Sequence, residues 1–487
     1  MNDPTSARNK ADFGVIDPAA ESAVDTSAAE IPSLQDELES LDGQSIQRQL
    51  ATIQRLYRRS LSIVDSSIPS LIHTSAKPLP STPPLQLLLK SPLTGSFLRL
   101  FSDSLSGNDN AAEGREGILY GALDTTAQRI LIGLLTSHRV DKGLWRQFHQ
   151  IFQLARANHS AQTNSDRSDR TFRDVYFGTV LLGCTQPACA STAEVAFLNT
   201  YFRRHAGAIE VHYRAPETIT DDFWIPPQSD VPALSCSRKR PPPDTAVLCF
   251  SSSGLSRLIR SHLVQLDSGT PPSELQLADF AATPTGESAL RHVAEFLDNP
   301  RTRRFPRRRQ NYRGEMCFGI EHVFQVRSEP TRRTPSSYWM IINESPDGYA
   351  AMHISGKAIP SSAGDIAALR TENSDNWQLC LIRWMHSANP EHHELGLQII
   401  ATRFIPAKVT ATPAPGLSLL QQSALYFPPT PPVHGHEALL LPAEARQSAN
   451  NALILIIEQG NVSVREIRLG PLEERTPRID IFRIAPA

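Results

Sequence analysis

The stretch SYWMIINESPDGYAAMHI, Ser337 to Ile354, carries the signals that decide the fold of the C-terminal half of the chain. Two short runs rich in aromatic and aliphatic residues flank a turn rich in Asn, Pro, Asp and Gly. Runs of this composition, bounded by turn formers, indicate β-strands. WQLCLIRWM and ELGLQIIATRF continue the pattern, and Leu395, Leu397 and Ile399 alternate as in a half-buried strand. Many short strands at regular spacing predict a small antiparallel β-barrel.

A cluster of arginines precedes these strands. Seven of the thirteen residues from Arg301 to Arg313 are arginine. The chain holds 41 Arg and only 7 Lys, but this bias accounts for a small part of the cluster. Three readings are open: a site for an anionic ligand, a solvated linker between domains, or a patch for nucleic acid or an acidic partner. A net charge of −2 argues against a dedicated nucleic-acid binder, which is usually basic overall.

The N-terminal part has a different pattern. The first 42 residues carry ten carboxylates against two basic side chains, which is typical of a disordered acidic tail. Ile46, Leu50, Ile53 and Tyr57 then follow the spacing of an amphipathic helix. Further helical patterns run over about 117–137, 141–157, 171–182 and 192–204.

The fold class predicted from these patterns is multidomain α+β. The predicted order is an N-terminal helical domain, a small mixed α/β segment, a C-terminal antiparallel β-barrel and a further β-rich extension. The extension includes a hairpin, NALILIIEQGNVSVREIRLG, that turns at Gly460 and Asn461. The predicted parts are 1–44 (acidic tail), 45–206 (helical domain), 207–300 (mixed segment), 301–406 (barrel with an N-terminal Arg-rich linker) and 407–487 (β-rich extension).

The sequence lacks the motifs of several functional classes. Six scattered cysteines indicate reduced thiols, and we expect no metal site. There is no phosphate-binding P-loop, no G-x-S-x-G elbow and no H-E-x-x-H motif, so we expect no catalytic residues and no enzyme activity. No apolar run is long enough for a membrane span, and the N-terminus lacks the pattern of a signal peptide. We therefore expect a cytoplasmic protein.

Two motifs together resemble the PilZ domain, the bacterial receptor module for cyclic di-GMP. PilZ domains carry an R-x-x-x-R element in a loop just before the barrel and a [D/N]-x-S-x-x-G element on its surface. Arg308, Arg309 and Arg313 match the first element, and Asn343, Ser345 and Gly348 match the second. The resemblance covers about residues 301–406. It implies a PilZ-like barrel that binds cyclic di-GMP through these six residues, without any other cofactor.

The residue types suit that ligand on chemical grounds. The planar Arg fork pairs bidentately with a phosphodiester or with the O6 and N7 edge of guanine. Asn343 offers a neutral amide where many family members have Asp. G-G-D-E-F and E-A-L signatures, which mark the enzymes that make or degrade cyclic di-GMP, are absent. The resemblance thus implies a non-catalytic receptor that signals to an unidentified protein partner through the helical domain. Motility, pili, surface polysaccharide (biofilm) and secretion are processes that the family controls.

Two alternatives remain at this stage. A PilZ-like scaffold could have lost nucleotide binding and serve only protein contacts. The Arg cluster could instead bind nucleic acid, with steep salt dependence and indifference to the cyclic dinucleotide.

Overall fold

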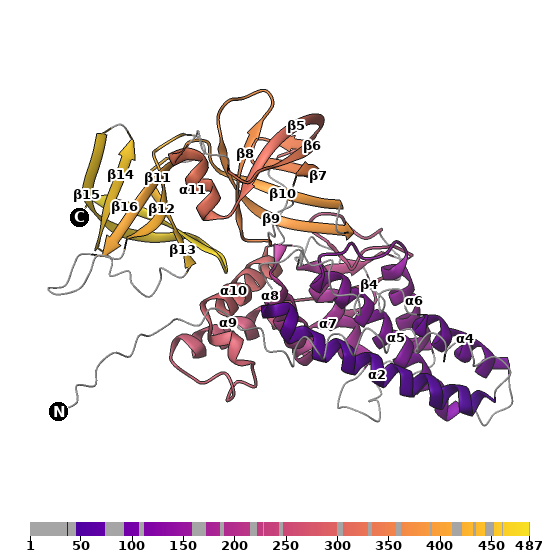
Figure 1. The fold of residues 1–487 in the computed structure, drawn as a ribbon. Coiled ribbons are helices and arrows are strands. Elements are labelled where there is room, and N and C mark those ends of the chain that lie inside the picture. The colour runs from indigo at the N-terminus through magenta and orange to yellow at the C-terminus, as the bar shows by residue number, and fades with distance from the viewer. Residues whose placement is uncertain are drawn as a thin grey trace, which may run out of the picture.

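The computed structural model describes residues 37, 45–73, 92–106, 112–157, 172–185, 189–214, 222–226, 228–242, 247–299, 305–329, 334–356, 362–389, 392–411, 421–431, 435–443, 452–459 and 461–486. The predicted acidic tail therefore lies outside the described residues, apart from Glu37. The predicted fold class is confirmed: a helical region, a small mixed segment and β-barrels follow one another along the chain (Figure 1).

Within the described residues, six long helices form the N-terminal region. They pack around α5, which is buried on all sides over residues 118–128. The helices are α2 (Ile46–His73), α4 (Leu93–Ser106), α5 (Ala112–Leu135), α6 (Leu144–Ala157), α7 (Phe172–Cys184) and α8 (Thr192–His205). Ser191 starts α8 with a capping box, because its side chain accepts from the Glu194 backbone while the Glu194 side chain accepts from the Ser191 backbone.

A buried ion pair lies in this helical core. Arg203 donates to Asp124 at 2.8 Å, and Tyr57 and Gln128 also donate to the same carboxylate. Burial alone would raise the pKa of Asp124, but Arg203 and the hydrogen bonds outweigh it and hold that pKa below its ordinary value. The network joins α2, α5 and α8, so it stabilises one arrangement of the three helices.

The mixed segment shares its core with the helices. Its four short strands lie in the order β1-β4-β2-β3, and Phe250 on β4 and Leu290 on α10 belong to the hydrophobic cluster of the helical region. The predicted boundary near residue 206 thus divides the sequence but not the core. The elements are β1 (Glu210–His212), β2 (Phe223–Ile225), β3 (Leu234–Ser235), β4 (Leu248–Ser251), α9 (Ser253–Asp267) and α10 (Pro284–Asp298).

Two closed barrels follow. The first barrel has the order β10-β7-β6-β5-β8-β9, and the second has the order β11-β12-β13-β16-β15-β14. The first consists of β5 (Arg308–Phe318), β6 (Ser337–Ser345), β7 (Gly348–Gly356), β8 (Ile366–Thr371), β9 (Gln378–Asn389) and β10 (His392–Ala401), with helix α11 (Ile320–Ser328) after β5. The second consists of β11 (Ile405–Ala411), β12 (Gln422–Phe427), β13 (Ala438–Pro442), β14 (Ala452–Gln459), β15 (Asn461–Arg475) and β16 (Ile479–Pro486).

The two barrels have the same connectivity. In each, the first strand lies beside the second, the second beside the third, the third beside the sixth, the sixth beside the fifth, the fifth beside the fourth, and the fourth beside the first. The predicted β-rich extension is thus a complete barrel. The predicted hairpin at its end is present as β14 and β15, which pair from Ala452–Arg468 to Gln459–Asn461.

The barrels pack against each other through one hydrophobic cluster. Leu379 and Leu381 of the first barrel share it with Leu425 and Leu440 of the second. Beside this cluster, Arg383 donates to both carboxylate oxygens of Glu474 at 3.0 and 2.7 Å. Burial of apolar surface is the larger stabilising term, so the shared cluster holds the two barrels together. The ion pair adds one specific polar contact between them.

Candidate functional site

The two sequence motifs lie side by side on β5 and β6. In the antiparallel register, Arg309 is opposite Asn343 and Arg308 is opposite Glu344. The Arg-rich segment was predicted to be a loop before the barrel. This prediction is wrong in one respect, because Arg308–Arg313 form the first part of strand β5. The backbone of this stretch can pair with β6, and a register shift between Arg309 and Tyr312 absorbs the extra residues.

The register shows which side chains share a face. Directly paired residues of antiparallel strands point to the same side of the sheet. One row across five strands is Arg309, Asn343, Ala350, Gly396 and Trp384. The neighbouring positions Ile341, Ala351, Leu395 and Met385 belong to the interior cluster of the barrel. The row with Arg309 is therefore on the outside.

A second outer row runs parallel to the first. It consists of Arg313, Met340, Met352, Glu394 and His386. The barrel is closed, so rows that cross five of its six strands extend around it, and we call only their part on β5, β6 and β7 the arginine face. Arg309 and Arg313 both lie on it because side chains alternate along a strand, so residues four positions apart point to the same side.

Arg308 lies on the opposite side of the sheet from Arg309. Its row continues through Glu344, Tyr349 and Leu397, and the last two belong to the interior cluster. Glu344 accepts hydrogen bonds from Gln310 and Tyr312, both at 3.1 Å. Arg308 is exposed at the open end of the barrel, and the structure does not bring it together with the other motif residues.

The turn between β6 and β7 places the remaining motif residues. Ser345 pairs with Gly348, and the Ser345 hydroxyl donates to the Gly348 carbonyl at 3.3 Å. A Cβ on Gly348 would lie 1.9 Å from the Leu397 carbonyl oxygen, so only glycine permits β10 to approach this turn. Gly348 also pairs with Gln398, which places Ser345, Gly348 and Gln398 at the border of the arginine face.

The polar groups of this surface have unused capacity. Arg309 and Arg313 are exposed, and their side chains make no hydrogen bond or ion pair within the part of the chain that the structure describes. The Oδ1 atom of Asn343 is buried and has no hydrogen-bond partner among the described residues. The two guanidinium groups are accessible from solvent, and the Asn343 oxygen is a buried acceptor that the fold leaves unsatisfied among the described residues.

Trp384 is an outward-facing residue of the first barrel that the sequence did not predict. Its indole lies over Gly396, where a Cβ would come within 1.8 Å of the indole Nε1. Trp384 is in the same outer row as Asn343, and an aromatic plane of this kind can stack on a nucleobase. Simple alternation along β9 does not reveal the outward position of Trp384, because a register shift in the pairing of β9 with β10 adds one residue, Arg383, before it.

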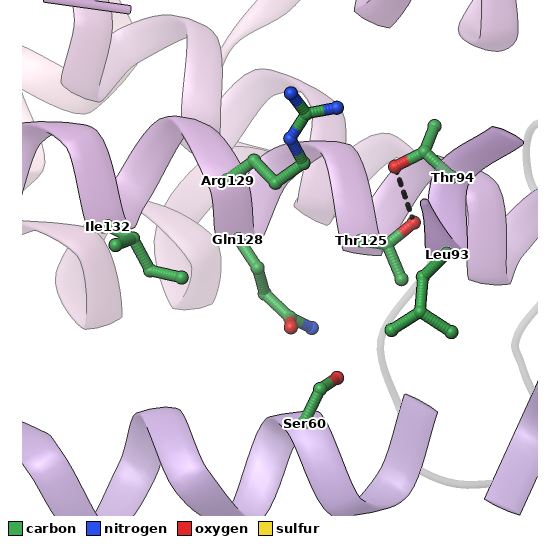
Figure 2. Close-up of a pocket in the computed structure, with 7 residues that line it drawn as sticks. All are labelled: Ser60, Leu93, Thr94, Thr125, Gln128, Arg129 and Ile132. Carbon is green, nitrogen blue, oxygen red and sulfur yellow. Dashed lines mark hydrogen bonds between the residues drawn. The ribbon is translucent and has the colours of Figure 1, made fainter. Parts of the chain in front are cut away.

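A small pocket elsewhere does not have this chemistry. It lies between α2, α4 and α5, and Figure 2 shows the Thr94 and Thr125 hydroxyls meeting at its edge, 3.2 Å apart. Its cavity volume of about 20 Å³ is far below the usual range of about 300–1,000 Å³ for ligand pockets. Its lining residues are Ser60, Leu93, Thr94, Thr125, Gln128, Arg129 and Ile132.

The described residues contain neither a metal-binding cluster nor a membrane-spanning helix. Among these residues, no group of three or more His, Cys, Asp or Glu side chains is arranged to hold a metal ion. Within the same ranges, no helix has the length and apolar character needed to cross a membrane.

Comparisons with known proteins agree with a PilZ-type barrel in this part of the chain. Residues 20–217 match the family model "Cyclic-di-GMP receptor FimW, N-terminal domain", and residues 323–406 match "Cyclic-di-GMP receptor FimW, middle PilZ domain". The second match includes Asn343, Ser345 and Gly348 but begins after Arg313. No curated protein matches the chain.

A solved structure also shows a limited similarity. The crystal structure of the Borreliella burgdorferi PlzA protein in complex with c-di-GMP is 9% identical to this chain, with a TM-score of 0.14. The similarity covers 37% of this chain and 87% of that one. A TM-score this low supports no statement about the fold, so the family assignment depends on the two family models. Together they span more than half of the 487 residues, and the chain belongs to the PilZ-domain family of bacterial cyclic-di-GMP receptors.

Proposed function

We propose that this protein is a non-catalytic receptor that binds cyclic di-GMP on the arginine face of its first barrel. The observation that carries the proposal is the register of β5 and β6, which puts Arg309 opposite Asn343 on the outside of the barrel. The membership of the family supports the choice of ligand. The proposed site consists of Arg309, Arg313, Asn343, Ser345 and Gly348. Arg308 lies at the border of this site and contributes only its positive charge.

Each group has a role that its chemistry allows. Arg309 and Arg313 pair bidentately with the phosphodiesters or with the O6 and N7 edge of guanine. The Asn343 side chain turns outward so that its Oδ1, a buried acceptor that the fold leaves without a partner among the described residues, accepts from a guanine N–H. Gly348 holds the turn against β10, so the Ser345 hydroxyl stays at a fixed position beside the ligand. Trp384 supplies a stacking plane.

We further propose that the bound state is communicated to a protein partner through the helical domain, in the cytoplasm. A ligand shifts an equilibrium only by its difference in affinity for the two states. A tenfold shift corresponds to about 1.4 kcal/mol, which a few charge-assisted contacts can supply.

Titration calorimetry with cyclic di-GMP tests the binding. We expect heat of binding with the full-length protein, and a loss of affinity of roughly tenfold or more in Arg309→Ala, by analogy with a bidentate base contact. Arg468→Ala is the matched control, because Arg468 is an exposed arginine on the second barrel, on β15. No heat at tens of micromolar protein would contradict the proposal.

The two rival functions have different outcomes in the same measurements. A scaffold without nucleotide binding gives no heat and an unchanged protein. A nucleic-acid binder shows affinity for a short oligonucleotide that falls steeply with salt concentration, and no response to the cyclic dinucleotide.

A further inference from the structure

One strand of the second barrel continues past the end of its neighbour. Residues 467–475 of β15 pair with β16, whereas residues 461–466 pair with β14 alone among the strands of the described chain. On the side away from β14, residues 461–466 therefore carry backbone N–H and C=O groups without a partner strand in the described part of the chain. We call this segment of β15, residues 461–466, the free edge.

The free edge is open to solvent. Val462 is 69% exposed and Val464 is 61% exposed, although both are large apolar side chains. Figure 1 shows β14 and β15 on the side of the second barrel that is turned away from the helical region. An exposed strand edge that carries apolar side chains is a surface on which another strand can be added.

The two valines lie on the outer face of the barrel. Ser463, between them, pairs with Ile457, which packs against the interior cluster of the second barrel. Val464 pairs with Ile456, one position away on β14. Because side chains alternate along a strand, Ser463 points to the inner side, and Val462 and Val464 both point outward.

The first barrel shows how a similar extension is covered within the chain. Residues 383–389 of β9 continue beyond the pairing with β8, and in the described ranges they pair with β10 alone. The loop between α5 and α6 lies against this part of β9, because the Ser137 backbone shares a hydrogen bond with His386. The free edge of β15 has no such cover among the described residues, so it is accessible to a second molecule.

The sequence of the free edge fits a second copy of itself. We consider two copies that pair antiparallel about a two-fold axis at Ser463. Val462 of one copy then lies opposite Val464 of the second copy, and the reverse holds by symmetry. Asn461 lies opposite Arg465 of the second copy, so no two like charges are opposed.

Neighbouring registers fit less well. An axis at Val464 places Val462 opposite the carboxylate of Glu466. An axis at Arg465 places two arginines directly opposite each other, which is destabilising. The register centred on Ser463 is therefore favoured, because it sets apolar side chains opposite apolar side chains.

We propose that the free edge of β15 pairs with the same edge of a second copy of this chain, so that the two second barrels share one continuous antiparallel sheet. This inference goes beyond the proposed function and does not depend on it. The free edge is shorter than the roughly 20–30 residues a side of a standard interface, so the dimer is weak and depends on concentration. Each copy keeps its arginine face free, because that surface is on the first barrel.

Sedimentation velocity on the full-length chain, across about a hundredfold range of concentration, tests the proposal. We expect the average mass to rise from monomer toward dimer as the concentration increases. We expect Val462→Lys/Val464→Lys to remain monomeric throughout, because lysine then lies opposite lysine between the copies. Val264→Lys is the matched control, since Val264 on α9 is 67% exposed, and this variant should dimerise like the unmodified protein.

A second double variant tests the register. In Val462→Lys/Val464→Glu, pairing about Ser463 places each introduced lysine opposite an introduced glutamate of the other copy. We expect the dimer to return in this variant and to weaken as salt is added. Because the variant carries the same lysine at an exposed position, its recovery shows that repulsion between the copies, and not misfolding, abolishes the dimer in Val462→Lys/Val464→Lys.

Four outcomes overturn the inference. A monomer at every concentration of the unmodified protein shows that the edge does not pair with itself. A dimer that survives in Val462→Lys/Val464→Lys lies on another surface. A dimer that Val264→Lys also abolishes depends on overall charge. A dimer that Val462→Lys/Val464→Glu does not restore excludes the pairing about Ser463. None of these measurements involves cyclic di-GMP, so they are distinct from a failure of the proposed function.

Discussion

The first barrel, β5 to β10, and the second barrel, β11 to β16, close their strands in the same cyclic order, yet their arginines have different surroundings. In the second barrel, Arg465 pairs with Glu437, Arg475 with Asp480 and Arg483 with Glu473. On the arginine face of the first barrel, Arg309 and Arg313 make no such pair within the described ranges.

The two barrels have the same cyclic order of strands and differ in the side chains that the strands carry. β11, with the sequence IPAKVTA, occupies the position of β5 and carries no arginine. The connection between β12 and β13 lacks an N-x-S-x-x-G motif. A fold can host many functions, and the function depends on the site built on it. In the second barrel these three arginines are paired with acids, whereas the Arg309 and Arg313 side chains of the first barrel have no such pair among the described residues.

The prediction with the largest expected effect tests whether ligand binding depends on the arginines of the first barrel and not on those of the second. We expect Arg309→Ala/Arg313→Ala to reduce affinity for cyclic di-GMP by about 100-fold or more, because each bidentate contact contributes roughly 1–3 kcal/mol. Calorimetry measures it. Arg468→Ala/Arg478→Ala in the second barrel is the control. If both pairs weaken binding equally, the ligand recognises overall charge and the distinction between the barrels is wrong.

A smaller effect concerns stability. Gly396→Ala places a Cβ within 1.8 Å of the Trp384 indole, so the ring must move. We expect a cost of about 1–3 kcal/mol in the free energy of unfolding, together with a change in tryptophan fluorescence. Urea denaturation measures the first quantity.

Gly470→Ala in the second barrel is the matched substitution. Its Cβ would meet the Arg483 carbonyl oxygen at 3.3 Å, which a small shift relieves. We expect a change within about 0.5 kcal/mol. Equal costs for the two glycines would show that close packing is general in both barrels and not particular to the Trp384 surface.

The periodicity of the sequence predicted the helices and strands of this fold. Which side chains share a face of the barrel could be seen only in the structure. The predicted helices at 141–157 and 192–204 are present as α6 and α8, and the strand around Leu395, Leu397 and Ile399 is present as β10. Local patterns suffice there because each element buries its own apolar stripe.

The outward position of Trp384 could not be predicted in this way, and Arg308 was predicted to lie in a loop although it begins strand β5. A register shift of one residue exchanges the two faces of a strand, and such shifts occur between Arg309 and Tyr312 and between Gly396 and Leu397. Closure of the second barrel was also hidden from the sequence, because the pairing of β11 with β14 joins segments that local patterns do not connect. The pairing of Arg309 with Asn343 brings together one residue from each of the two predicted motifs.

The ion pair between the barrels gives a third and smaller test of the comparison. Glu474→Gln leaves Arg383 without its acid, and Arg383 also donates to Gln398 beside Gly348. The pair is partly exposed, so we expect a loss of about 0.5–1 kcal/mol in stability that shrinks as salt is added. Thermal unfolding at two salt concentrations measures it. A larger loss that salt does not change would indicate that the ion pair holds the barrels together instead of the apolar cluster.

The prediction with the smallest expected effect tests whether ligand binding depends on where the arginines lie or only on how many there are. Arg308 is next to Arg309 in the sequence, but its row leads to the interior residues Tyr349 and Leu397. We expect Arg308→Ala to weaken cyclic di-GMP binding by no more than about twofold, since an exposed charge at the border is well screened. Calorimetry beside Arg309→Ala checks this. If Arg308→Ala and Arg309→Ala lose equal affinity, strand β5 must leave its register when the ligand binds, because in the present register their side chains cannot reach the same face.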